Sequence, residues 1–301
     1  MPAALSIETT LLPGAPALLE LHAAELPQRD DLCGAFCVSL ALRAALAGPP
    51  AAGGPGGEHP GRDAGAFDQD AGLFDQDALD QDAVALAAGT VVSKRPDPSI
   101  LPAGEAGRRD YRLSLPSIED SALSGTTAAG LIEAAGRLSA GRLAAIPYAG
   151  PWTTATLAGL FDLLAAQPRP AAMVANLATH HLWGSHPRPD RLLAYLLDGS
   201  IDGPPPDWDV GHFVCVVGRL DGPRGSLYAV ADTYPSLGSA GVHVQPQERL
   251  AAAIDRRDKP AGGVLAVVSA PDAPAVRALA AELGLVENVW DNGTPALEPP
   301  S

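Results

Sequence analysis

Cys33 stands where the apolar periodicity of residues 32–47 predicts the start of a buried helix. At a helix start, unpaired backbone N–H groups and the positive end of the helix dipole stabilise a thiolate, the reactive form of cysteine. Gly34 leaves the sulfur approachable, and Gln28 can bring an amide N–H₂ group to the same place. Such a donor could stabilise the oxyanion that forms when a thiolate attacks a carbonyl carbon. The segment therefore predicts nucleophilic chemistry at Cys33.

A nucleophilic thiolate needs a base, and His212 is the best placed of the seven histidines. It opens an apolar strand predicted at 212–220, so its ring can stand at a sheet edge in a cleft. Asp232 ends the next predicted strand, 226–232. Two antiparallel neighbours joined by a turn can bring His212 and Asp232 together, and the carboxylate would then orient the imidazole.

The order of these residues resembles that of the papain-like cysteine peptidases, especially the bacterial branch that contains the bacteriocin-processing, double-glycine-leader peptidases. That branch reads Gln, a short gap, Cys-Gly, then Gly-His opening an apolar strand, then a strand that ends in Asp-Pro. The matching residues here are Gln28, Cys33-Gly34, Gly211-His212-Phe213-Val214 and Asp232. The resemblance covers 28–47 and 209–269. This sequence departs from the pattern of that branch in three places. The gap after Gln28 is one residue shorter than usual, Ala35 replaces a frequent Pro, and Thr233 replaces the Pro after the Asp.

The resemblance implies a papain-like fold, in which an N-terminal helical part, with the nucleophile at a helix start, packs on a mainly antiparallel sheet. It implies that Cys33 is the nucleophile, His212 the general base and acid, Asp232 the orienting residue and Gln28 the oxyanion donor. The substrate would be a peptide or a small amide or thioester, and no cofactor is expected.

The elements that would position these residues follow from the apolar patterns. Helices are predicted at 32–47, 80–88, 126–139, 153–166, 188–198, 246–257 and 272–284. Strands are predicted at 142–148, 171–177, 212–220, 226–232 and 263–269. The last three strands lie close together and are joined by short Gly-containing loops, which favours an antiparallel sheet. The predicted fold class is therefore α+β.

The chain is predicted to form one domain over 1–287, followed by a flexible tail at 288–301 that is rich in Pro and Gly. Residues 48–78 are predicted to be a low-complexity surface insertion within that domain. The unit Asp-Gln-Asp-Ala occurs three times within 68–83, a period too short for a solenoid and typical of a lengthened loop. A calcium loop starting at Asp68 would lack its closing Glu.

Charge and missing motifs exclude several classes of protein. The 301 residues carry 20 Lys and Arg against 35 Asp and Glu, a formal net charge of −15, which argues against a nucleic-acid partner. No basic region precedes an apolar stretch at the N-terminus, and no apolar run reaches about 18 residues, so we expect a cytoplasmic protein without a membrane partner. Phosphate-loop, dinucleotide, zincin and serine-hydrolase motifs are absent. The oligomeric state stays open.

Two further groups of residues have alternative interpretations. Cys37 and Cys215 are expected in the core, and a redox pair of Cys33 with Cys37 is a weaker hypothesis because its spacing differs from Cys-x-x-Cys. Three histidines lie within a seven-residue segment, at positions 180, 181 and 186. No cysteine or carboxylate lies beside them at ligand spacing, so this segment is expected to flank the cleft, with Trp183 as lining, and not to bind a metal.

The leading hypothesis is a thiol hydrolase, a peptidase or amidase that forms an acyl-enzyme at Cys33, with acyl transfer to another acceptor left open. The alternative is a catalytically inactive module that binds a peptide or protein partner in the same cleft. The two differ in thiolate chemistry, which only the enzyme requires.

Overall fold

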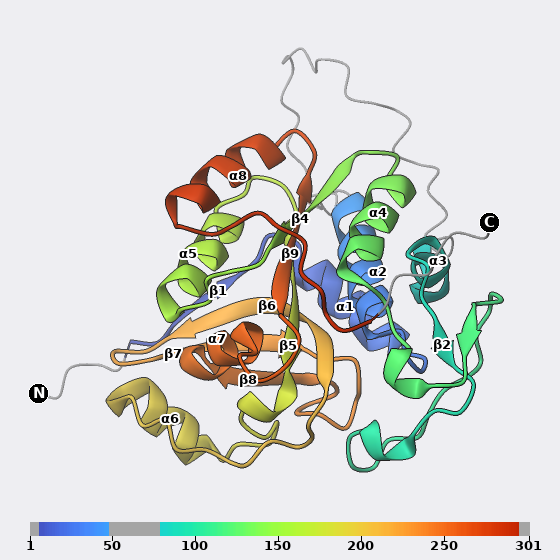
Figure 1. The fold of residues 1–301 in the computed structure, drawn as a ribbon. Coiled ribbons are helices and arrows are strands. Elements are labelled where there is room, and N and C mark those ends of the chain that lie inside the picture. The colour runs from blue at the N-terminus through green and yellow to red at the C-terminus, as the bar shows by residue number, and fades with distance from the viewer. Residues whose placement is uncertain (1–5, 48–78, 295–301) are drawn as a thin grey trace, which may run out of the picture.

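The computed structural model describes residues 6–47 and 79–294 (Figure 1). Its centre is a seven-stranded sheet in which every pair of neighbouring strands is antiparallel. The strands are β1 (Glu8–Leu11), β4 (Leu143–Tyr148), β5 (Ala172–Ala178), β6 (Gly211–Asp221), β7 (Ser226–Ala231), β8 (Val242–Pro246) and β9 (Gly263–Ser269). Their order is β4-β9-β5-β6-β7-β8, and β1 pairs with the end of β6 beyond the residues that pair with β5.

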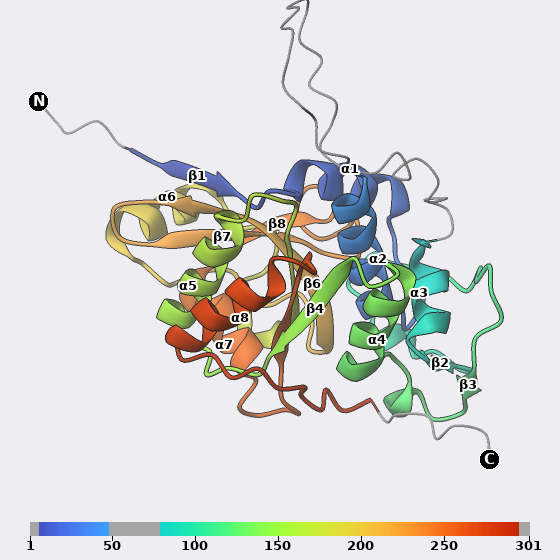
Figure 2. The ribbon, with the colours of Figure 1, turned by 90° about the horizontal axis from the view of Figure 1, so that it is seen from above.

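Helices cover both faces of this sheet (Figure 2). The N-terminal helices α1 (Ala15–Glu25), α2 (Cys33–Leu46), α3 (Gln81–Ala87) and α4 (Ala128–Leu138) form one layer, in which α2 packs directly on β5, β6 and β9. On the other face lie α5 (Thr154–Ala165), α7 (Gln247–Asp255) and α8 (Ala273–Glu282), while α6 (Pro189–Asp198) packs through Tyr195 near β7. The α+β class, with N-terminal helices on a mainly antiparallel sheet, is confirmed.

Short elements complete the described chain. They are β2 (Val92–Ser93) and β3 (Ser117–Ile118), which pair in parallel, and the 3₁₀ helices η3 (Pro98–Ile100), η4 (Ser121–Leu123) and η5 (Thr179–His181). Each predicted helix and strand is present, with its ends within two residues of the prediction. The sequence patterns did not reveal α1, β1 or β8. No helix of the described residues is long and apolar enough to cross a membrane.

The predicted domain limits relate to the structure in different ways. The predicted insertion at 48–78 lies outside the described residues, as does the end of the predicted tail, 295–301. Residues 288–294 are described, and two of their side chains contact the rest of the domain. Trp290 is 5% exposed and its indole nitrogen donates to Asn176, while the Asn292 amide donates to the backbone of Thr126.

The buried helix α2 forms because its residues are apolar or small on almost every side. Residues 34–42 are all buried, as expected for a helix that is apolar on every side and lies in the core. Gly34 permits the close approach of β6, because a Cβ there would lie 3.2 Å from the ring of Phe213 and 2.9 Å from Leu131. The start of α2 is thereby fixed against the start of β6.

Two glycines of α4 provide a matched test of how this helix packs on the end of α3. A Cβ at Gly130 would lie 2.1 Å from the carbonyl oxygen of Ala88, so Gly130→Ala is expected to lower the free energy of unfolding by about 1–3 kcal/mol. No atom lies within 4 Å of a Cβ at Gly136. Gly136→Ala should therefore raise the free energy by up to about 1 kcal/mol through helix propensity. Urea unfolding measures both, and equal midpoints would contradict the packing of α4 on the end of α3.

Candidate active site

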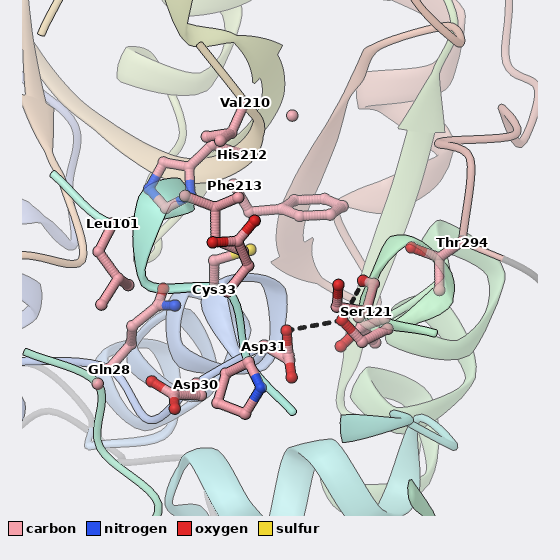
Figure 3. A pocket seen from close by; sticks show the side chains of 18 of the residues that line it. Gln28, Asp30, Asp31, Cys33, Leu101, Ser121, Val210, His212, Phe213 and Thr294 are labelled. Carbon is pink, nitrogen blue, oxygen red and sulfur yellow. Dashed lines mark hydrogen bonds between the residues drawn. The ribbon is translucent and has the colours of Figure 1, made fainter. Parts of the chain in front are cut away.

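The structure brings Cys33, His212 and Asp232 to one place. Cys33 is the first residue of α2, His212 is the second residue of β6, and Asp232 directly follows β7. Because β6 and β7 form an antiparallel hairpin and α2 packs on β6, the three side chains meet where these elements begin or end. Figure 3 shows Cys33, His212 and the amide of Gln28 directed toward the same space. The ring of His212 lies on an interior strand of the sheet and not at the sheet edge that we expected.

One nitrogen of the His212 imidazole is bonded to polar groups of the loop after β7. Nε2 lies 2.9 Å from Asp232 Oδ1 and 3.2 Å from Thr233 Oγ1, which leaves Nδ1 for an interaction with Cys33. Both His212 and Asp232 are almost fully buried, at 2% and 1% exposure. Burial alone would lower the pKa of His212. The Asp232 carboxylate, together with the hydrogen bond and charge of Cys33, has the larger effect and raises the pKa to about 10. The buried ring therefore favours its protonated form.

Asp232 is held as a carboxylate by several donors. Burial raises its pKa, but His212 and His243 lower it more strongly, so the pKa lies well below its usual range. His243 Nε2 lies 3.3 Å from Oδ2, and the backbone N–H of Thr233 donates to Oδ1 at 2.7 Å. A proline at 233 could not make this last bond because it has no N–H. The departure from the Asp-Pro pattern thus adds a donor to the carboxylate and a hydroxyl beside the imidazole.

Two histidines of this network were not predicted from the sequence. His22, on α1, places Nε2 2.5 Å from the backbone carbonyl of Asp232, and burial lowers its pKa. His243, on β8, is bonded through Nδ1 to the side-chain amide of Gln245 at 3.0 Å, which leaves its Nε2 to donate to Asp232. The alternation of Val and polar residues over 242–245 would place the two Val side chains inward, whereas His243 and Gln245 are the buried ones, so no sequence signal revealed them.

Gln28 lies beside the same site and is buried, at 5% exposure. Its Nε2 donates to the hydroxyl of Tyr234 at 3.1 Å, and its backbone N–H donates to the carbonyl of Thr233 at 3.0 Å. These two bonds join the loop before Cys33 to the loop after β7. Tyr234 and Trp208 also flank the imidazole of His212, with ring centroids 6.3 Å and 4.9 Å from it. The ring that faces Cys33 is therefore enclosed by aromatic side chains.

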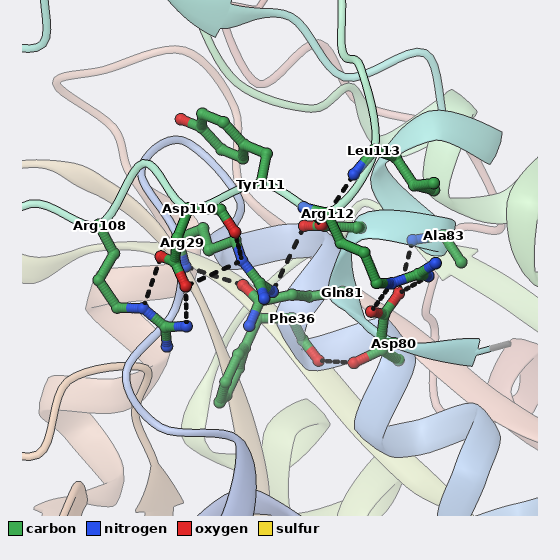
Figure 4. Close-up of polar contacts among 12 residues, drawn as sticks. Arg29, Phe36, Asp80, Gln81, Ala83, Arg108, Asp110, Tyr111, Arg112 and Leu113 are labelled. Carbon is green, nitrogen blue, oxygen red and sulfur yellow. Dashed lines mark hydrogen bonds and ion pairs between the residues drawn. The ribbon is translucent and has the colours of Figure 1, made fainter. Parts of the chain in front are cut away.

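The loop that precedes Cys33 is fixed by polar and charged residues of 108–112 and of α3 (Figure 4). Arg108 donates to the backbone carbonyl of Pro27 at 2.6 Å and is paired with Asp110. Arg29 donates through Nε to the backbone of Asp110, and its own N–H donates to the side chain of Gln81 at 2.8 Å. Residues distant in sequence thus position the residues immediately before Cys33.

A cavity of about 430 Å³ opens in front of Cys33. Acidic and basic side chains on its wall are Asp30, Asp31, Asp97, Arg109 and Arg256, and apolar ones include Ile100, Leu101, Trp208, Val210 and Phe213. Two buried acceptor atoms on this wall, Gln28 Oε1 and Asp30 Oδ2, have no hydrogen-bond partner among the described residues. The cavity is large enough for a small substrate or for a few residues of a peptide.

Residues 12–291 match the model of DUF6885, a family of unknown function. The chain belongs to the DUF6885 family. No curated protein and no solved structure matches it. All of the catalytic residues predicted from the sequence, and the two additional histidines, lie within the part of the chain that the DUF6885 model covers.

The other cysteines of this DUF6885 protein lie in the core, as predicted. Cys37 and Cys215 are 0% and 1% exposed, and burial raises the pKa of Cys37. Cys33 is partly exposed, and all three thiols are free, so no disulfide joins Cys33 to Cys37. Trp183 does not line the cavity, contrary to our expectation. It is 2% exposed and packs against Tyr195, at a ring-centroid distance of 5.7 Å. Trp208 is the tryptophan that faces the site.

Proposed function

We propose that this protein is a papain-like thiol hydrolase that acts on an amide or thioester carbonyl through an acyl-enzyme at Cys33. The observation that carries the proposal is the buried imidazole of His212, bonded to Asp232 through one nitrogen and facing Cys33 at the wall of a cavity with the other. A packing histidine has no need of both a buried carboxylate and a partly exposed thiol. The order of Gln28, Cys33, His212 and Asp232 in the chain also supports the papain-like assignment.

The proposed reaction has two steps. The Cys33 thiolate attacks the carbonyl carbon, the S–C bond forms, and the C–N or C–S bond breaks as the His212 imidazolium gives its proton to the leaving amine or thiol. A water molecule then gives a proton to His212 and attacks the thioester carbonyl carbon; the new C–O bond forms, the C–S bond to Cys33 breaks, and the acid leaves with the thiolate–imidazolium pair restored. The unpaired N–H groups at the start of α2, with the Gln28 amide, would stabilise the oxyanion in both steps.

The wall of the cavity beside Gln28 and Asp30 favours a substrate that presents hydrogen-bond donors, whereas Arg256, whose buried Nε has no partner among the described residues, favours an acceptor at its own part of the wall. Gln28 Oε1 and Asp30 Oδ2 are acceptors without partners, and a buried acceptor without a donor is costly. Burial raises the pKa of Asp30 in the free protein. A bound amide or ammonium group would provide the missing donor. We therefore propose a peptide or small molecule that carries N–H groups close to the reacting carbonyl.

A panel of coumarin amides and acyl thioesters, with lysine, alanine or glutamate as the acyl group, tests the proposal. The wild-type protein is expected to release one leaving group per chain in a burst, and peptide mass spectrometry should find the acyl group on Cys33. Cys33→Ala should lose the burst and the adduct, and lysine should react faster than glutamate. If no compound acylates Cys33, and peptides bind equally to the wild type and to Cys33→Ala, the inactive binding module is the better description.

A further inference from the structure

A second group of side chains, outside the proposed catalytic site, converges where three loops meet. His180 and His181 lie in η5, directly after β5, and Asp209 lies just before β6, so the antiparallel pairing of these strands places them together. The third loop follows α7, which packs on β5 and on η5. Arg256 ends α7 in a left-handed conformation, with φ of 46°, and the chain turns there to present Asp258 to both histidines.

The distances within this group match those among the ligands of one metal ion. Asp258 Oδ2 lies 2.7 Å from His180 Nε2, and Asp258 Oδ1 lies 3.0 Å from His181 Nε2. All three ligand atoms lie within 4.8 Å of one another. In a tetrahedral zinc site with bonds of about 2.0 Å, neighbouring ligand atoms are about 3.3 Å apart. Small side-chain rotations would therefore complete the site without movement of the backbone.

A carboxylate also lies behind one of the two histidines. His180 Nδ1 is 2.9 Å from Asp209 Oδ1, which is itself paired with Lys259. The nitrogen makes no well-aligned hydrogen bond among the described residues, so a small rotation of the ring or of the carboxylate is needed before Asp209 can accept its proton. Histidines that bind metals usually have a carboxylate or carbonyl at their second ring nitrogen, because it fixes the ring and makes the other nitrogen a better ligand. Asp209 is not one of the three proposed ligands, so its approach to His180 adds a fourth residue to the cluster.

The surroundings of the group also suit a metal ion. The three residues are half-buried or exposed, so an ion can reach them from solvent. His181 borders a hollow of about 390 Å³ that Glu248 also lines. A metal bound by the three side chains would face this hollow with a coordination position open to water or to another ligand.

We propose that His180, His181 and Asp258 form a binding site for a divalent transition metal ion of the zinc class. Two imidazole nitrogens and one carboxylate oxygen suit zinc and its neighbours in the first transition row, whereas magnesium and calcium prefer oxygen ligands. The site joins the loop after β5 to the loop that carries Arg256, and Asp209 joins it to the loop that carries Trp208. Both Arg256 and Trp208 line the proposed catalytic cavity. The ion would hold that wall of the cavity in place.

Calorimetric titration with Zn²⁺ tests this site, and the Cys33→Ser variant is the protein to use because a thiol beside His212 could also bind zinc. One equivalent is expected to bind, with a raised thermal unfolding midpoint, and excess Mg²⁺ should not compete. His181→Gln and Asp258→Asn should each weaken the affinity at least about tenfold. His186→Gln is the matched control. His186 is exposed, and its Nδ1 lies 3.0 Å from the hydroxyl of the neighbouring Ser185.

The result does not depend on whether the protein is a hydrolase. Unchanged unfolding midpoints in the absence of metal would show that the variants are folded. If Zn²⁺ fails to bind to the Cys33→Ser protein, or binds equally well after His181→Gln and Asp258→Asn, the site proposed here is wrong. A visible absorption spectrum of tetrahedral Co²⁺ that is lost in both variants would confirm the ligands by a second method.

Discussion

His212→Ala is expected to slow the labelling of Cys33 by iodoacetamide at pH 6.5 by about 10- to 100-fold. An ordinary thiol has a pKa of about 8.5 and is only about 1% ionised at this pH, whereas a thiol paired with an imidazolium is largely ionised. The pKa of His212 is raised to about 10, so its positive charge persists through the neutral range beside Cys33. The rate is read from the Cys33 peptide by mass spectrometry.

The pH dependence distinguishes the pair from an unassisted thiol. The wild-type rate should change little from pH 6.5 to 9, because the imidazolium is lost only as the pH rises through about 10. The rate for His212→Ala should instead rise about tenfold per pH unit below about 8.5. His186→Ala, at an exposed histidine, should behave as the wild type does. Equal rates for His212→Ala and the wild type at pH 6.5 would rule out the thiolate–imidazolium pair.

Asp232→Asn is expected to lower the free energy of unfolding by about 3–5 kcal/mol at pH 6, the usual effect of removing one member of a buried ion pair. The amide has almost the same size as the carboxylate but leaves the buried charge of His212 without its partner. Urea unfolding at several pH values measures the loss. Asp162→Asn is the control, since Asp162 is 58% exposed and pairs with Arg219 at the surface, where an ion pair contributes at most about 1 kcal/mol.

The sign of each pKa shift fixes the pH at which the loss is largest. Asp232 has a lowered pKa, so its contribution is present above the unfolded value of about 4 and is lost as the pH falls through its lower folded value. His212 has a raised pKa, so its contribution is complete below about pH 6.5 and disappears as the pH rises through about 10. The loss should be largest between about pH 4 and 6.5. Equal losses at pH 6 and pH 10 would contradict an ionised pair.

The sequence patterns predicted most elements because their apolar residues follow the helix or strand period. Residues 213–217 and 264–268 are continuous apolar runs, and they lie in β6 and β9. In contrast, β8 is short and carries His243 and Gln245 on its buried face, so its residues do not form an apolar pattern. The helix α1 buries only three of its residues, too few for a clear apolar face.

The proposed catalytic residues could be selected from the sequence because each stands at the start or end of a strongly patterned element. Cys33 begins α2, His212 begins β6 and Asp232 follows β7. The remaining contacts could not be predicted in this way. His22 reaches Asp232 across 210 residues, and Asp258 reaches His181 across 77. Such contacts depend on which strands become neighbours, and the order of strands is not contained in local periodicity.

The position of β9 has a consequence for the synthesis of the protein. This strand is formed by residues 263–269 of 301, yet it lies between β4 and β5 and is hydrogen-bonded to both. A nascent chain that ends before these residues cannot close the centre of the sheet on which α2 packs. Cys33 and His212 are both translated before β9, but the sheet on which α2 packs is complete only after residues 263–269 have been made. We therefore expect the final surroundings of both side chains to form only once β9 is available.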